Sequence, residues 1–432
     1  MKKIVYIFAF CIIFLANSAH ALSLIRDTEV EEAVLGWVQD IFKAANLEPE
    51  NARIMLVNDP SINAFVAGGQ TIFIHTGLIT QSKVLDDLMF VLSHETGHVV
   101  GGHVTRGMIT YKNIQTASLI STILGGVIAV AAGRPDAGIA VMVGSQSSAL
   151  GSFLSYRQTE ESSADRTAID IMNKLGYSMQ GFTDTMQAIQ HLERINMSED
   201  SGYLRTHPLT QTRMQDVAHF TKHAPTPKPN ATFDRIKAKL VGFMDDPKAN
   251  LQQYKTNSRT DQYIQAISLY RLNKHTEAFN LLDKLIAAEP NNPYLYELKG
   301  QFYFETGHIP QAITNYEQAN QLKPFAPLIE TALAQSYLEN KTKDNAQKAL
   351  ILLQHVVIEE EEPTLPWRLM ASAYDVLKDP LGAQYAMVEY NFALDKKSVA
   401  LASAKKLITK IPPNHPHHQR LEDIITLADK KD

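Results

Sequence analysis

The stretch His-Glu-Thr-Gly-His at residues 94–98 constrains the fold more strongly than any other part of the sequence. Residues four positions apart lie on one face of an α-helix, about one turn apart, so His94 and His98 can direct ring nitrogens toward one point. Glu95 lies about 100° around the helix, too far for a third ligand but near a water molecule bound there. An apolar run just before the motif places this helix in a core, where unsatisfied polar groups are costly. The sequence therefore predicts a helix over about 85–101 that carries two metal ligands and a general base.

A catalytic zinc site needs a third protein ligand, and two candidates compete for that role. His103 follows the motif, but the spacing that would bring a third histidine to the metal ends at Val104, so His103 is rotated away. Glu161 and Asp165 stand four residues apart in a segment with helical apolar spacing, which puts both carboxylates on one helix face. We therefore predict Glu161 as the third ligand and Asp165 as the carboxylate that orients a metal-bound histidine.

The chain of 432 residues is too long for one ordinary core and divides into four parts. Residues 1–21 combine two lysines, an apolar run and small residues before a cleavage site, which predicts a secretory signal peptide; the alternative is an uncleaved membrane anchor, for which the apolar run is short. Residues 22–222 show mixed helix and strand patterns. Residues 223–258 form a proline-rich linker and a connecting helix, and residues 259–432 are helical and repetitive.

The C-terminal part repeats with a period of 34 residues. Pro290 and Pro324 are 34 residues apart, as are Ala278 and Ala312. This period, with aromatic residues and glycines at matching offsets, is typical of tetratricopeptide units, in which small residues let paired helices approach while aromatic rings fill the space between them. The pattern predicts a curved solenoid whose concave face binds a partner; the alternative is a purely stabilising role.

Charge and cysteine content exclude several classes of protein. Cys11 is the only cysteine and lies in the predicted signal peptide, so the mature chain forms no disulfide and cannot be a cysteine protease. Loss of Lys2 and Lys3 changes the formal charge from -5 to -7, because residues 1–21 contain no acidic residue. A mildly acidic exported protein without a basic tract is not expected to bind nucleic acid.

Four further features complete the predictions. His207, followed by proline, has three competing roles: an oxyanion donor, a fourth metal ligand that keeps the site inactive until it is displaced, or a structural residue. The apolar segment 117–132 is interpreted as a flap over the site or a surface that contacts the membrane or a partner, with core burial and membrane spanning as alternatives. The acidic run 359–362 is expected to be a solvated loop. The strand expected over residues 70–75 is interpreted as a sheet edge with which an extended substrate pairs.

The two metal motifs together resemble those of the gluzincin metallopeptidases of peptidase family M48, which includes HtpX and the CAAX prenyl proteases. Residues 63–65, ahead of the motif helix, also resemble that family's approach to its active site. Gln158 departs from the pattern, because many relatives have arginine there. The resemblance covers nearly the whole mature chain. It implies an α+β zincin-type metalloprotease domain, mostly helical with a small sheet, followed by an all-α tetratricopeptide solenoid.

What the resemblance implies for function is a zinc metalloendopeptidase of the bacterial periplasm, with one Zn²⁺ per chain held by His94, His98 and Glu161. Glu95 would be its general base. Members that join an exported catalytic domain to such repeats serve outer-membrane protein assembly and quality control. The expected partners are therefore unfolded or stalled outer-membrane proteins and the β-barrel assembly machinery, with peripheral membrane contact and no nucleic acid. The alternative is a chaperone or adaptor whose metal site stays mostly latent and whose repeats bind partners.

Overall fold

The computed structural model describes residues 23–67, 69–103, 158–179, 225–361 and 363–429, together with the single residues 207, 213 and 215. The predicted signal peptide, residues 1–21, and the apolar segment 117–132 lie outside these residues. Among the described residues, no helix combines the length and the apolar character that crossing a bilayer requires.

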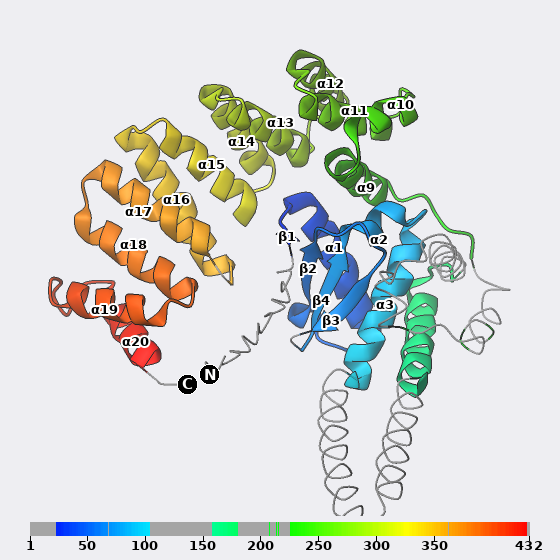
Figure 1. Cartoon of the computed structure of the whole chain (residues 1–432), viewed down its shortest axis with the longest axis horizontal. Helices are drawn as coiled ribbons and strands as arrows, with labels where there is room; N and C mark the ends of the chain where they lie inside the picture. Colours follow the sequence, from blue (N-terminus) through cyan, green and yellow to red (C-terminus); the bar gives the residue numbers. More distant parts are fainter. Residues whose placement is uncertain are drawn as a thin grey trace, which may run out of the picture.

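A four-stranded sheet and the long helices packed against it form the core of the N-terminal half (Figure 1). Helix α1 (Thr28–Ala44) begins at Asp27, whose side chain accepts a hydrogen bond from the backbone N–H of Val30. Its residues Val30, Val34, Val38 and Ile41 recur at helical spacing and are fully buried. The strands are β1 (Leu24–Ile25), β2 (Arg53–Val57), β3 (Ala64–Ala67) and β4 (Thr71–His75), with the short 3-10 helix η1 (Pro49–Asn51) before β2.

The strand order β1-β2-β4-β3 corrects the predicted position of the substrate-binding edge. β4 pairs in parallel with β2 and antiparallel with β3, so the strand over residues 70–75 lies inside the sheet. The prediction that this strand is an edge is therefore wrong. In the described part of the sheet, β1 and β3 are the edge strands, and β3 packs beside the helix that carries the histidine motif.

That helix is α3 (Leu85–Gly101), which follows the short helix α2 (Thr76–Gln81). Asp87 fixes its start, because its carboxylate accepts hydrogen bonds from the backbone N–H groups of Lys83 and Val84. Gly102 ends it in a left-handed conformation with φ of 61°. Residues 158–175 form a second helix, unlabelled in Figure 1, which lies beside α3. Both helices were predicted from their periodicity and both are confirmed.

The C-terminal half is a succession of antiparallel helix pairs in a curved array, coloured green to red in Figure 1. Gly300 shows why small residues recur, since a Cβ atom there would lie 3.0 Å from the ring of Tyr316. The predicted helical solenoid is confirmed, and its assignment to the tetratricopeptide type stays a prediction. Its helices are α10 (Pro247–Gln253), α11 (Arg259–Arg271), α12 (His275–Ala288), α13 (Pro293–Glu305), α14 (Ile309–Leu322), α15 (Pro327–Glu339), α16 (Lys343–Glu359), α17 (Thr364–Leu377), α18 (Pro380–Ala393), α19 (Lys397–Ile408) and α20 (His418–Asp429).

Helix α9 (Ala231–Met244) joins the two halves by contributing to both of their cores. Phe233 and Ile236 on one face pack into the core under the sheet, while Ala238 and Val241 on another face pack against the first solenoid helices. The connecting helix is therefore a shared structural element rather than a flexible spacer.

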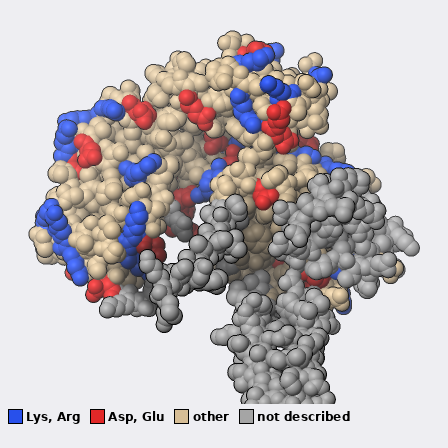
Figure 2. Space-filling model, viewed as in Figure 1, with Lys and Arg blue, Asp and Glu red and all other residues tan. Residues whose placement is uncertain are grey.

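Polar contacts add to this junction at the start of α1. The buried Glu29 carboxylate pairs with Arg235 of α9 and accepts a hydrogen bond from the Tyr263 hydroxyl at 3.2 Å. Buried Lys239 lies 2.7 Å from the Asp27 carboxylate. Figure 2 shows charged side chains of both signs interspersed over the solenoid face that it displays.

The acidic run after α16 also contacts the N-terminal half. Glu360 pairs with Arg26 at 2.9 Å, and Glu361 pairs with Arg53 at 2.7 Å. The expectation of a solvated loop is therefore wrong for Glu360, whose side chain is only 17% exposed, but it holds for Glu361, whose side chain is 68% exposed. Such exposed pairs contribute little stability individually but fix where the middle of the solenoid meets the sheet.

Candidate metal centre

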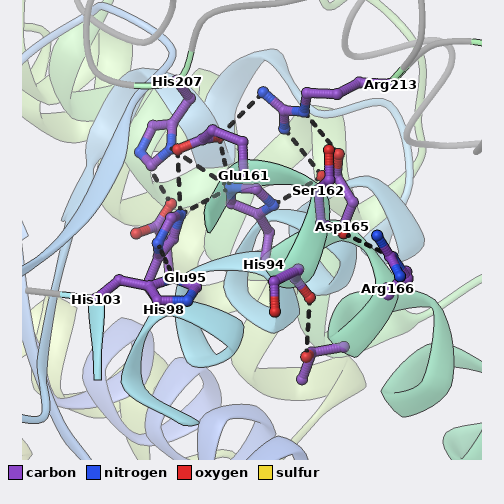
Figure 3. Close-up of polar contacts among 12 residues, drawn as sticks. His94, Glu95, His98, His103, Glu161, Ser162, Asp165, Arg166, His207 and Arg213 are labelled. Carbon is purple, nitrogen blue, oxygen red and sulfur yellow. Dashed lines mark hydrogen bonds and ion pairs between the residues drawn. The ribbon is translucent and has the colours of Figure 1, made fainter. Parts of the chain in front are cut away.

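Helix α3 places both motif histidines in the core, with their Nε2 atoms 3.2 Å apart (Figure 3). His94 is fully buried and His98 is nearly so. The helix over residues 158–175 brings Glu161 to the same point, with Oε2 lying 3.4 Å from His94 Nε2 and Oε1 lying 3.4 Å from His98 Nε2. The three predicted ligands therefore meet, although 62 residues lie between His98 and Glu161 in the sequence.

Gly97 within the motif permits this close approach of the two helices. A Cβ atom at Gly97 would lie 2.8 Å from both the Cα and the carbonyl oxygen of Ala164. A larger residue would push the backbone of the second helix outward and move Glu161 away from the histidines. The small pair Gly97 and Ala164 thus sets the distance between the predicted ligands.

His207 joins the cluster from a third segment. Its Nδ1 lies 3.1 Å from Glu161 Oε1 and 3.3 Å from His94 Nε2, and its Nε2 lies 3.3 Å from Glu95 Oε1. His94, His98, Glu161 and His207 each offer a ligand atom, all of these atoms lie within 4.8 Å of one another, and all four residues are buried. Glu95, also buried, thus lies beside the cluster without belonging to it.

Asp165 and Arg213 contact the cluster residues His94 and Glu161 and orient them. Asp165 Oδ1 lies 2.9 Å from His94 Nδ1, as predicted for the orienting carboxylate. Arg213 donates to both oxygens of Asp165, at 2.6 and 2.9 Å, and its Nη1 lies 3.0 Å from Glu161 Oε2. Sequence reasoning assigned no role to Arg213. Two buried carboxylates require a compensating cation, and this requirement could have pointed to a buried arginine near Glu161 and Asp165.

These contacts govern the protonation of the cluster. Burial lowers the pKa of His94, but hydrogen bonds to Asp165 and Glu161 outweigh burial and raise that pKa to about 9. Burial and the charge of His94 lower the pKa of His98 to about 2, so its ring is neutral. Burial alone would raise the pKa of Glu161, yet hydrogen bonds from His207 and His94 hold it well below the usual range. Burial raises the pKa of Glu95.

His103 does not reach the cluster. Its Nδ1 lies 2.9 Å from His98 Nδ1, on the side of the ring opposite the nitrogen that faces Glu161. Of the two candidates, Glu161 therefore lies in the cluster with His94 and His98 and His103 does not, and the assignment of the third ligand stays a prediction.

The donor set suits a zinc ion. Imidazole nitrogens and a carboxylate oxygen are zinc's ordinary ligands in proteins. The neutral His98 ring has a lone pair to offer, and a metal that displaces the proton of His94 would relieve the close approach of two buried nitrogens that lie 3.2 Å apart. The residues present therefore fit a metal.

Comparison with known proteins gives a consistent result. The family model described as "Peptidase family M48" matches residues 26–221 of this chain. The beta-barrel assembly-enhancing protease of Escherichia coli (strain K12) is 24% identical over 371 residues, which cover 82% of this chain and 74% of that protein. Its namesake from Yersinia pestis is 26% identical over 330 residues, or 74% of this chain and 66% of the relative. Metalloprotease LoiP of Escherichia coli (strain K12) is 25% identical over 175 residues, covering 40% and 63% of the two chains.

Proposed function

Residues 26–221 form a metalloprotease domain of peptidase family M48, and from this premise we propose that the protein is a periplasmic zinc endopeptidase that removes misfolded or stalled outer-membrane barrel proteins. The family implies a divalent metal. The observation that carries the proposal is the buried cluster of His94, His98, Glu161 and His207 with Glu95 beside it. The names of the relatives, which refer to β-barrel assembly, support the substrate class.

In the proposed reaction, His94, His98 and Glu161 hold the zinc ion. When bound, zinc supplies Lewis acidity, which polarises a carbonyl group and lowers the pKa of water. Glu95 accepts a proton from the attacking water and passes it to the leaving amine. Burial, which raises the pKa of this carboxyl group, makes it a stronger base than an exposed glutamate.

We propose that the edge strand β3 binds the substrate. Among the described strands β3 pairs with β4 alone, and it lies against α3, so an extended peptide added to its other side would pass beside the motif helix. Backbone hydrogen bonds would supply the affinity, which tolerates many sequences. Unfolded or stalled barrel proteins expose such extended segments, and the solenoid would dock the β-barrel assembly machinery.

A zinc measurement tests the metal proposal directly. The purified full-length chain is expected to contain about one zinc ion, and His98→Ala is expected to lose most of it, because the substitution removes one of the two imidazole ligands that the motif helix supplies. His355→Ala serves as the control, since His355 pairs with Glu330 in the solenoid, away from the cluster. Elemental analysis measures the zinc content. Absence of metal from the wild-type chain would contradict the proposed enzyme and favour a protein that only binds partners.

We further propose that His207 occupies the fourth ligand position and keeps the enzyme latent. Its Nδ1 lies among the predicted ligand atoms, where a substrate carbonyl would otherwise enter. His207→Ala is therefore expected to raise cleavage of an unfolded barrel protein several-fold, in proportion to the fraction of enzyme that is normally blocked. Initial rates at equal zinc content check this. A fall in rate would instead assign His207 to the oxyanion.

A further inference from the structure

The two histidines of α3 resemble each other in how their outer nitrogens are engaged. Each ring turns Nε2 toward the cluster and Nδ1 away from it. His94 Nδ1 lies 2.9 Å from the Asp165 carboxylate, and His98 Nδ1 lies 2.9 Å from His103 Nδ1. His103 is itself buried. Figure 3 shows His103 next to His98. The position that Asp165 fills for one histidine is thus filled for the other by an imidazole.

We propose that His103 is a positioning residue of the metal site, whose Nδ1 accepts a hydrogen bond from His98 Nδ1–H. This inference rests on the proposed zinc function. Two imidazole nitrogens 2.9 Å apart share a single proton. When His98 carries it, the lone pair of His98 Nε2 faces the cluster and is available to a cation. When His103 Nδ1 carries the proton of this contact, the neutral His98 ring holds its own proton on Nε2. That N–H then points at Glu161 and leaves no lone pair for a metal.

The end of α3 is built to make this contact. Gly102 adopts a left-handed conformation and its N–H bonds to the carbonyl of Val99 at 2.9 Å, so the chain folds back on the helix. The ring of His103 then occupies the space where a Cβ of Gly101 would lie, only 2.1 Å from His103 Nε2. Any side chain at position 101 would therefore displace His103 from His98. His103 follows His98 by five residues, which is the wrong spacing for a third ligand but brings its ring to the outer nitrogen of His98.

His103 differs chemically from Asp165 in one respect that matters for the site. A neutral imidazole acceptor selects a tautomer without adding negative charge, whereas a carboxylate does both. The site already contains the buried carboxylates of Glu95, Glu161 and Asp165, with Arg213 as a cation beside the last two. A further carboxylate behind His98 would add negative charge to a buried site that already holds three acidic side chains.

Zinc affinity of the full-length chain tests the proposal. His103→Leu removes the acceptor and is expected to weaken zinc binding about 10–100-fold. His103→Asn keeps an acceptor at a similar distance from the backbone and is expected to restore the affinity to within about threefold of wild type. His75→Leu is the matched control, because His75 is a buried histidine whose Nδ1 lies 2.9 Å from the Ser61 hydroxyl and which is not one of the four residues of the cluster. Its zinc affinity is expected to be unchanged.

The measurement is competition between metal-free protein and a coloured zinc chelator, with circular dichroism to verify folding. Gly101→Ala provides a second route, since it displaces the His103 ring without removing it and is expected to weaken zinc binding as well. The inference is overturned if His103→Leu and Gly101→Ala bind zinc as tightly as wild type, or if His103→Asn is as weak as His103→Leu. Absence of zinc binding by the wild-type chain would overturn the proposed function too, so the two failures are distinguishable.

Discussion

Glu95→Gln is expected to retain zinc while slowing peptide cleavage about 10²–10⁴-fold, the usual effect of removing a general base. Glutamine has the same shape as glutamate but cannot accept a proton. Glu95 is buried, its Oε1 lies 3.3 Å from His207 Nε2, and it is not among the four residues that offer ligand atoms. The substitution therefore removes the proton acceptor and leaves the proposed ligand set intact.

Initial rates on an unfolded outer-membrane protein, with zinc content determined on the same samples, check this expectation. Glu277→Gln is the matched control, because Glu277 lies on the exposed surface of α12 and is expected to have no effect on rate. A Glu95→Gln enzyme that keeps more than about a tenth of the wild-type rate would show that another group acts as the base.

The same variant separates the protease from the chaperone alternative. If cleavage is the main function, cells that contain only Glu95→Gln lose outer-membrane integrity, and cross-linking of this inactive form captures uncleaved substrates. If the repeats act chiefly by binding partners, the variant supports the outer membrane as well as wild type does. Cell permeability to large antibiotics and the identity of the captured proteins together distinguish these outcomes.

Local periodicity explains what the sequence predicted correctly. The helix over residues 85–101 and the helix that carries Glu161 follow from apolar spacing and from glycines at their ends, which are properties of neighbouring residues. Because each helix fixes the face on which its polar residues lie, the candidate ligands on each helix could also be identified. That the two faces meet was predicted because a zinc site needs a third protein ligand, and the resemblance of the two motifs to a known family implied the same.

Features that depend on distant contacts were not predictable in this way. The parallel pairing of β2 with β4 decides that β3 is the sheet edge, and no pattern within one strand reports that pairing. The partial burial of Glu360 was not predicted because Arg26, its partner, lies 334 residues away. Arg213 was missed for the same reason, since its importance arises only when Glu161 and Asp165 lie opposite it.

Arg213→Leu is expected to lower the free energy of unfolding of the catalytic domain by about 3–5 kcal/mol. Arg213 is nearly fully buried and forms three contacts of 2.6–3.0 Å with two buried carboxylates. Leucine fills much of the space but leaves His94 as the remaining cation beside the two carboxylates, at 2.9 Å from Asp165 and 3.4 Å from Glu161. Removing one partner of a buried ion pair is far more costly than replacing the whole pair. Asp165 would then orient His94 less firmly, so zinc affinity should fall as well.

Denaturant unfolding with zinc chelated measures the effect, since bound metal would otherwise add its own stabilisation. Trp37 reports on the catalytic domain, because it packs against Phe233 at 6.3 Å between ring centroids, and a Trp367→Phe background removes the only other tryptophan. Arg166→Leu is the matched control. Arg166 is exposed on the same helix as Asp165, so its loss should cost less than about 0.5 kcal/mol. Equal stability of the two variants would mean that the buried carboxylates are neutralised by some group other than Arg213.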